Sequence, residues 1–211
     1  MLTAIIDYSS GNLHSARKAF EKISASNNLG SVVVTSNPDV ICSADRLVLP
    51  GDGAFPACKT ELLSSEAYDA MVYAAVEKGR PFLGICVGMQ LMAIKGYEYE
   101  ETDGLGWIDG EVYKIDQTGE NLKIPHMGWN TLRIANQHPI LRDIFDGDHV
   151  YFIHSFQMVV SNPKQRLAYT DYGTDITAVV GKDNLLGFQF HPEKSGQTGL
   201  KMIQNFLSWS P

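Results

Sequence analysis

Short apolar runs alternate with amphipathic segments through the first half of the chain. Runs of strand length occupy residues 2–6, 32–34, 46–49 and 82–85. Residues 13–23 place apolar side chains at helical spacing with charged side chains mostly opposite, and residues 56–78 read as one or two further helices. Strands and helices that alternate in this way are typical of right-handed crossover units in a parallel sheet.

The pattern changes after residue 97. Residues 110–115 alternate between apolar and polar side chains, which indicates antiparallel strands. Further strands are expected at residues 150–160, 167–172, 177–180 and 185–190, followed by a last helix at 200–209. No linker, repeat or low-complexity tract interrupts this order. The sequence therefore predicts a single α/β domain over residues 1–211, with a mostly parallel central sheet, flanking helices and added antiparallel strands in the C-terminal half.

Composition narrows the class of protein. The 211 residues suffice for one sizeable core, and the net charge of −7 argues against a nucleic-acid surface, which needs a basic patch. No apolar run is long enough to span a membrane, and the N-terminus has no pattern of a signal peptide. The three cysteines are odd in number and are not spaced as metal ligands. We therefore expect a cytoplasmic protein without a metal site.

The stretch around Cys86 carries the first chemical signal. The apolar run at 82–85 ends at this cysteine, and residues 87–94 are apolar enough to begin a buried helix. Gly84 and Gly88 flank Cys86 at two residues on either side, which suits a sharp strand-to-helix turn with an exposed nucleophile. A helix N-terminus there would favour the thiolate. A buried structural cysteine between two packing glycines is the alternative.

A second signal lies about a hundred residues downstream. The apolar run at 185–190 ends at His191, and Glu193 follows two positions later. A nucleophilic cysteine needs a base, and that base needs an acceptor that fixes its tautomer and stabilises its imidazolium form. Pro192 restricts the backbone between the two side chains. His191 and Glu193 are therefore the candidates for base and orienting carboxylate, and a polar turn after a strand is the alternative for this segment alone.

Taken together, these two segments resemble the class I glutamine amidotransferases. Four further stretches make the chain similar to the glutaminase subunits of imidazole glycerol phosphate synthases. They are Asp7-Tyr8 with Gly11-Asn12, Pro50-Gly51-Asp52-Gly53-Ala54-Phe55, Pro125-His126-Met127-Gly128-Trp129-Asn130 and Tyr151-Phe152-Ile153-His154-Ser155-Phe156. The resemblance covers nearly the whole chain, from Ile5 to about Phe206, and implies a flavodoxin-like α/β fold.

The resemblance also implies roles for individual residues. It makes Cys86, His191 and Glu193 a catalytic triad that hydrolyses glutamine, and it implies no cofactor. The loop of Gly51, Asp52 and Gly53, together with the N–H of Val87, is expected to bind the oxyanion. Gln90, His154, Ser155 and Phe156 are expected to bind glutamine.

Two positions depart from the common pattern: Asp52 stands where relatives often have valine, and Phe156 stands where they often have tyrosine.

The implied partner is a (β/α)8-barrel cyclase subunit, with which the chain would form a heterodimer. The cyclase would use the ammonia to make imidazole glycerol phosphate and aminoimidazole carboxamide ribotide in histidine biosynthesis. Aromatic residues and methionine are enriched at interfaces. The resemblance assigns a set of residues to the face that meets the cyclase: Tyr8, Gly11, Asn12, Pro125, His126, Met127, Gly128, Trp129 and Asn130.

Three alternatives remain at this stage. A stand-alone γ-glutamyl hydrolase would share the triad and would be fully active without a partner. The glutaminase of pyridoxal phosphate synthase shares the fold, but the segment at residues 125–130 points away from it. A non-catalytic binding protein on the same scaffold would form no covalent adduct with a glutamine-mimicking alkylator.

Overall fold

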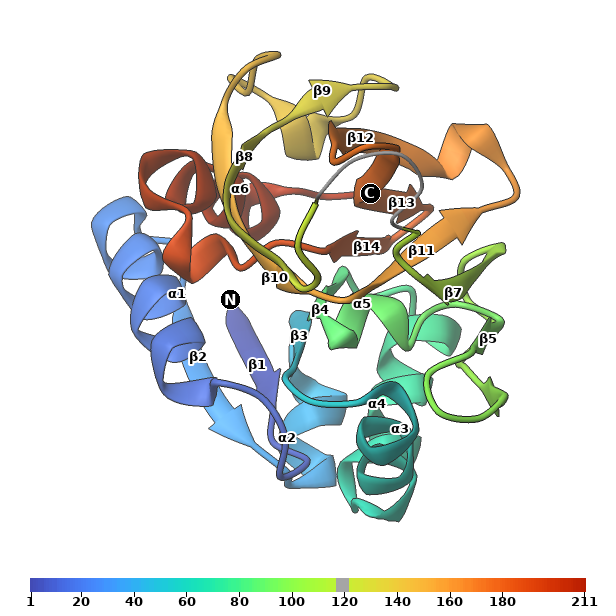
Figure 1. Cartoon of the computed structure of the whole chain (residues 1–211). Coiled ribbons are helices and arrows are strands. Elements are labelled where there is room, and N and C mark those ends of the chain that lie inside the picture. The colour runs from blue at the N-terminus through green and yellow to red at the C-terminus, as the bar shows by residue number, and fades with distance from the viewer. Residues whose placement is uncertain (117–121) are drawn as a thin grey trace.

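A mixed β-sheet runs through the middle of the molecule (Figure 1). The computed structural model describes residues 1–116 and 122–211, and all statements on structure refer to these residues. Within them the sheet has eight strands in the order β2-β1-β3-β4-β14-β13-β12-β9. The first five are mutually parallel: β2 (Ser31–Thr35), β1 (Leu2–Ile6), β3 (Arg46–Gly51), β4 (Phe82–Cys86) and β14 (Leu185–Phe188). The last three are antiparallel: β13 (Asp175–Lys182), β12 (Arg166–Asp171) and β9 (Arg133–Ile134).

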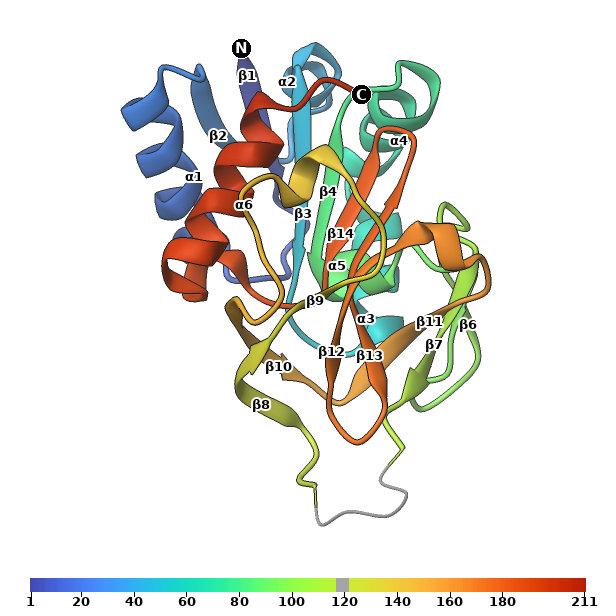
Figure 2. The same ribbon diagram turned by 90° about the horizontal axis from the view of Figure 1, so that it is seen from above.

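Helices cover both faces of the parallel strands (Figure 2). On one face α1 (Leu13–Asn27) packs beside α6 (Gly196–Ser208), with edge-to-face contact between Phe20 and Phe206. The other face carries α2 (Pro38–Ser43), α3 (Phe55–Ser64) and α4 (Ala67–Val72), and α4 continues into a π-helical turn, η1 (Tyr73–Glu77). This arrangement confirms the predicted α/β fold with antiparallel strands added in the C-terminal half.

The helices predicted over residues 56–78 do not bury one continuous apolar face. Leu62, Ala67 and Met71 are fully buried, but Leu63 is 49% exposed and Val76 is 53% exposed. The segment is divided among α3, α4 and the π-helical turn η1, with a break at Ser65 and Glu66. Because these pieces do not share one helical repeat, a single apolar stripe cannot run through them all.

Two smaller sheets lie beside the main one. One pairs β8 (His126–Thr131) with β10 (His149–His154), and the other joins β11 (Phe156–Val160), β7 (Gly110–Lys114), β5 (Lys95–Gly96) and β6 (Thr102–Asp103). The single strand predicted at residues 150–160 is therefore wrong. It breaks at Ser155, so that His154 pairs with His126 in one sheet and Phe156 pairs with Lys114 in the other. This break places residues 154–156 beside Cys86.

Three short 3-10 turns complete the described elements: η2 (Pro139–Leu141), η3 (Pro163–Gln165) and η4 (Pro192–Lys194). The main core lies between the sheet and its helices and contains fully buried phenylalanines from both halves of the chain. None of the helices in the described ranges combines the length and the apolar character that crossing a bilayer requires.

Candidate active site

Cys86 lies at a sharp turn between β4 and the short helix α5 (Val87–Gln90). Its backbone angles are φ 54° and ψ −113°, a strained conformation for a residue other than glycine. The flanking glycines make this turn possible because the chain segments touch there. A Cβ atom at Gly88 would lie 1.9 Å from the carbonyl oxygen of Leu49, and one at Gly84 would lie 2.5 Å from that of Gly88. The structure therefore forms the predicted nucleophile elbow.

The helix after Cys86 is much shorter than predicted. After Gln90 the hydrogen bonds tighten to the 3-10 spacing, from the Met92 N–H to the Met89 carbonyl and from the Ala93 N–H to the Gln90 carbonyl. The Ile94 N–H then bonds to the Gly110 carbonyl. Because α5 has only one turn, few peptide dipoles add up along it and its helix dipole is weak. The helix therefore adds little positive potential at Cys86.

His191 lies between Cys86 and Glu193. Its Nδ1 atom lies 2.9 Å from Oε1 of Glu193, and the ring interacts electrostatically with the Cys86 side chain. All three side chains are buried. Burial alone would lower the pKa of His191, but its hydrogen bonds to Cys86 and to Glu193 outweigh burial and raise that pKa above its ordinary value. The structure thus brings the three predicted triad residues together in the order nucleophile, base and carboxylate.

The backbone fixes His191, the predicted base, in place. The His191 N–H donates to the carbonyl of Tyr151 at 3.0 Å. The Ser195 hydroxyl donates to the His191 carbonyl at 2.6 Å and accepts the Tyr151 N–H at 2.9 Å. Since Tyr151 belongs to β10, the base is attached to the same strand that carries His154.

The predicted oxyanion residues lie next to the nucleophile. Gly51 is buried at the end of β3 and pairs with Cys86 in the sheet register. Asp52 and Gly53 are exposed and border the cavity at Cys86. The carbonyl of Asp52 accepts a hydrogen bond from the Ser10 hydroxyl at 2.9 Å. Val87 follows Cys86 directly and also borders the cavity.

A cavity of about 210 Å³ opens at Cys86. All four residues predicted to bind glutamine border it, and the complete lining is Asp52, Gly53, Cys86, Val87, Gln90, Glu98, Pro125, Ile153, His154, Ser155 and Phe156. The Gln90 amide nitrogen donates to the Phe156 carbonyl and to Oε1 of Gln189, each at 3.0 Å. These two bonds fix the orientation of the Gln90 side chain within the cavity wall.

Glu98 is a member of this wall that the sequence reasoning missed. Its Oε2 atom accepts the Phe55 N–H at 2.8 Å, which holds the carboxylate at the cavity. Glu98 lies in a run of charged residues between β5 and β6, and such a run is usually a solvated loop. No local signal separates it from Glu100 or Glu101, and only the tertiary fold brings it to Cys86.

The residues assigned to a partner surface differ in their exposure. Met127 and Trp129 are 59% and 56% exposed on β8, and Pro125 and Asn12 are also exposed. Gly11, Gly128 and Asn130 are half-buried. Tyr8 and His126, by contrast, are each only 2% exposed. Tyr8 packs beneath the loop of Gly51, and His126 faces His154, so these two side chains point inward.

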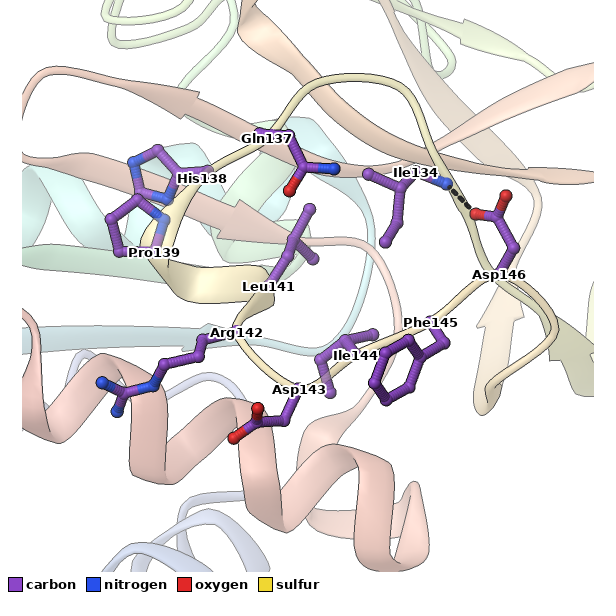
Figure 3. Close-up of a pocket in the computed structure, with 10 residues that line it drawn as sticks. All are labelled: Ile134, Gln137, His138, Pro139, Leu141, Arg142, Asp143, Ile144, Phe145 and Asp146. Atoms are coloured by element: carbon purple, nitrogen blue, oxygen red, sulfur yellow. Dashed lines mark hydrogen bonds between the residues drawn. The ribbon is translucent and has the colours of Figure 1, made fainter.

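A hollow larger than the cavity at Cys86 lies elsewhere on the surface (Figure 3). It has a volume of about 870 Å³ and is bordered by residues of the segment from Ile134 to Asp146. None of the triad residues borders it.

Of the other cysteines, Cys42 is exposed and Cys58 is buried against Ser10. Among residues 1–116 and 122–211, no group of three histidine, cysteine, aspartate or glutamate side chains is placed to hold a metal ion.

Comparisons with known proteins show the family of the chain. The family model "Glutamine amidotransferase class-I" matches residues 4–209. Two solved structures, a glutamine amidotransferase and another from Thermotoga maritima, align with TM-scores of 0.69 and 0.61 at 18% identity. They cover 98% and 94% of this chain, and the alignments span 99% and 78% of theirs. At this identity the two structures show the fold.

Much nearer in sequence are curated proteins named imidazole glycerol phosphate synthase subunit HisH. Those of Ruegeria pomeroyi, Cereibacter sphaeroides and Rhodopseudomonas palustris are 62%, 53% and 52% identical, and each alignment covers 100% of both chains. The chain therefore belongs to the class I glutamine amidotransferase family and, within it, to the HisH subunits of imidazole glycerol phosphate synthase.

Proposed function

We propose that Cys86, His191 and Glu193 are the triad with which this chain, a glutaminase subunit of histidine biosynthesis, hydrolyses glutamine to glutamate and ammonia. The observation that carries the proposal is the placement of Cys86, His191 and Glu193 together at a cavity, with Nδ1 of His191 2.9 Å from Oε1 of Glu193. Because Nδ1 of His191 bonds to Glu193, Nε2 faces the sulfur. That is the nitrogen a general base needs.

The reaction follows from these positions. The Cys86 thiolate attacks the side-chain amide carbon of glutamine, a carbon–sulfur bond forms, and the carbonyl electron pair moves to the oxygen. Nε2–H of His191 then protonates the amide nitrogen, which leaves as ammonia with formation of a thioester. The neutral imidazole next takes a proton from water, the hydroxide attacks the thioester, and Cys86 leaves as thiolate. Glu193 stabilises the imidazolium in each step without receiving the proton.

Backbone amides would stabilise the negative oxygen in both tetrahedral intermediates. The candidates are the N–H groups of Gly51, Asp52, Gly53 and Val87, which adjoin Cys86 or border its cavity. Each well-placed donor of this kind typically contributes about 10²–10³ in kcat.

The cavity wall would hold the amino-acid end of glutamine. His154, Ser155 and Phe156 border one side, and their contribution is mainly through the backbone, so the phenylalanine at position 156 need not weaken binding. Gln90 supports the same wall. Glu98 provides the carboxylate that the α-ammonium group requires, because a cation in a partly dry cavity needs an opposite charge.

The name of the relatives implies a partner subunit, and we infer that it is a (β/α)8-barrel cyclase. Ammonia is readily protonated and lost in water, so a closed route to the cyclase is expected. The exposed Met127 and Trp129 on β8 suit an interface, and β8 pairs with β10, which ends at the cavity. Release into the barrel would deliver ammonia to an active site at its C-terminal face.

The test combines this chain with the cyclase subunit of the same organism. Cys86→Ser should abolish product formation from glutamine, a loss of about 10⁵-fold or more, yet leave product formation from ammonium salts intact. Cys42→Ser, a matched change at an exposed cysteine, should alter neither rate. Loss of both activities in Cys86→Ser would contradict the assignment. Full glutaminase turnover by the wild-type chain alone would favour a stand-alone γ-glutamyl hydrolase instead.

A further inference from the structure

A chain of hydrogen bonds connects the wall of the glutamine cavity to strand β8. Nδ1 of His154 lies 2.8 Å from the carbonyl oxygen of Phe156. Nε2 of His154 lies 3.0 Å from Nδ1 of His126, and Nε2 of His126 lies 3.3 Å from the amide nitrogen of Asn130. The two imidazoles are 6% and 2% exposed. The series therefore runs through the interior, from the half-buried Asn130 to the cavity wall.

Elementary chemistry fixes the direction of every donor in this series. A carbonyl oxygen only accepts, so His154 must donate from Nδ1 to Phe156. Burial lowers the pKa of His154 to about 3 and that of His126 to about 4, so each ring is neutral at pH 7 and carries one proton. Nε2 of His154 must then accept, and His126 must donate to it from Nδ1. Nε2 of His126 accepts in turn from Asn130.

The outer end of the series is fixed in the same way. The amide nitrogen of Asn130 also donates to the Asp171 carbonyl at 2.9 Å, and its Oδ1 accepts the Thr131 N–H at 2.8 Å. These two bonds determine which end of the amide carries hydrogen. Asn130 is therefore a donor toward His126 and cannot reverse without losing both of its other bonds.

Packing holds the His126 ring in the plane that the series requires. Its ring stacks on Phe152 with centroids 4.6 Å apart at 23°, and on Tyr172 with centroids 4.0 Å apart at 26°. At the inner end, the Phe156 carbonyl receives a second hydrogen bond from Gln90. The same oxygen thus fixes both the His154 ring and the Gln90 amide, and both border the cavity.

We propose that His126 is a positioning residue for the glutamine cavity, which it serves by donating to His154 and so holding the Phe156 carbonyl and Gln90 in place. The proposal rests on the proposed function and assigns His126 no contact with glutamine. Without the proton from His126, Nε2 of His154 loses its partner and the tautomer of His154 is no longer fixed. The wall then gains alternative arrangements, and glutamine binding weakens more than the chemical step.

Two substitutions separate this role from simple filling of space. His126→Phe keeps a flat ring between Phe152 and Tyr172 but removes the donor. His126→Asn loses the stacking but places an amide N–H near the position of Nδ1, from which it can donate to His154. We expect His126→Phe to raise KM for glutamine about three- to tenfold, the effect of about one buried hydrogen bond, with kcat changed less than about twofold. We expect His126→Asn to stay within about twofold of the wild-type KM. The opposite order would overturn the proposal.

A labelling experiment gives a readout that does not depend on turnover. Iodoacetamide and a chloroketone analogue of glutamine both alkylate a reactive cysteine, but only the analogue uses the amino-acid subsite. His126→Phe should slow labelling of Cys86 by the analogue about three- to tenfold and leave labelling by iodoacetamide unchanged. Equal slowing by both reagents would mean that the substitution disturbs the triad, and the proposal would fail. No labelling of wild-type Cys86 by the analogue would instead refute the proposed function itself.

The tautomers can be measured in the wild-type protein, so the proposal stays testable if a variant does not fold. Nitrogen NMR of protein labelled with ¹⁵N-histidine distinguishes protonated from unprotonated ring nitrogens. At pH 7 both His126 and His154 should carry their proton on Nδ1 and none on Nε2. A proton on Nε2 of either ring would reverse the series and overturn the assignment.

Discussion

Nδ1 of His191 lies 2.9 Å from Oε1 of Glu193, although Pro192 alone separates the two residues in the chain. The proline begins the 3-10 turn η4, and this turn folds the glutamate back beneath the imidazole. Both side chains are almost fully buried. Base and carboxylate therefore form one rigid unit, and only the nucleophile must come from a distant part of the chain.

This arrangement predicts different losses for its two members. Glu193→Gln keeps an oxygen that can accept from Nδ1 of His191, so the tautomer survives and only the stabilisation of the imidazolium is lost. We expect kcat for glutamine to fall about 10²–10³-fold, against about 10⁵-fold or more for His191→Ala, which removes the proton carrier. The measurement is glutaminase kcat of both variants across pH. Equal losses at every pH would show that the division of roles is wrong.

Glu98 yields a prediction about substrate recognition. Glu98→Gln retains an oxygen that can accept the Phe55 N–H, so the loop should keep its place while the negative charge disappears. We expect KM for glutamine to rise about 10- to 100-fold, because hydrogen bonds to charged groups contribute about 1.5–3 kcal/mol. The change in kcat should be small.

Glutaramic acid, which is glutamine without its α-amino group, is the matched control substrate for Glu98→Gln. The wild-type chain should strongly prefer glutamine over it, and Glu98→Gln should lose most of that preference. An unchanged ratio of kcat/KM for the two substrates would show that Glu98 does not face the α-ammonium group.

The contrast between Glu98 and the triad shows what the sequence could and could not predict. Cys86 ends one apolar strand of the parallel sheet and His191 follows another, and carboxyl ends of such strands meet at one edge, so local patterns were sufficient to predict that the two residues lie close together. Glu98 lies in a loop between two short strands whose packing depends on distant residues. No periodic pattern of apolar and polar residues distinguishes Glu98 from its neighbours.

The sequence also did not show which polar and aromatic side chains would be buried. The segment at residues 125–130 has the composition of an interface, and its exposed Met127 and Trp129 fit that expectation. In a strand, however, neighbouring side chains point to opposite faces, so His126 turns inward beside Met127. The break of the predicted long strand at Ser155 also follows from pairing with two different sheets, which no local pattern reveals.

The buried pair of neutral histidines predicts acid sensitivity. In the unfolded chain histidine has a pKa of about 6.5, whereas burial lowers the folded-state pKa of His126 to about 4 and of His154 to about 3. Below pH 6.5 the unfolded state therefore binds protons that the folded state does not, and stability falls as pH falls. Each histidine contributes a slope of up to about 1.4 kcal/mol per pH unit, so the pair contributes up to about 2.8 kcal/mol per unit near pH 5. The slope becomes smaller toward pH 4, where His126 begins to bind its proton in the folded state.

Neighbouring groups do not reverse this slope. His191, which opposes protonation of His154, has a raised folded-state pKa, so it is charged in both states in acid and adds no dependence there. Urea unfolding from pH 7 to pH 4 measures the effect, with His126→Phe as the control. The control should show a slope smaller by about 1.4 kcal/mol per unit, and an identical slope would show that His126 is not buried neutral.

The last prediction concerns the loop that carries the expected oxyanion donors. The Ser10 hydroxyl donates to the Asp52 carbonyl at 2.9 Å and lies 3.2 Å from the buried Cys58 sulfur. In a trans peptide the carbonyl and the following N–H point in opposite directions, so a fixed Asp52 carbonyl also fixes the Gly53 N–H. Ser10→Ala should free this peptide to rotate and lower kcat for glutamine about 10- to 100-fold, up to the loss of one oxyanion donor, with little change in KM.

Asp52→Val is the matched control within the same peptide. The Asp52 side chain is exposed, and its backbone carbonyl, which the substitution retains, makes the contact with Ser10. We therefore expect Asp52→Val to keep kcat within about threefold of wild type, both alone and with the cyclase. A loss in Asp52→Val as large as that in Ser10→Ala would assign the effect to the carboxylate. A normal kcat in Ser10→Ala would show that the peptide between Asp52 and Gly53 is fixed by other contacts, and the hydroxyl would then have no part in forming the oxyanion site.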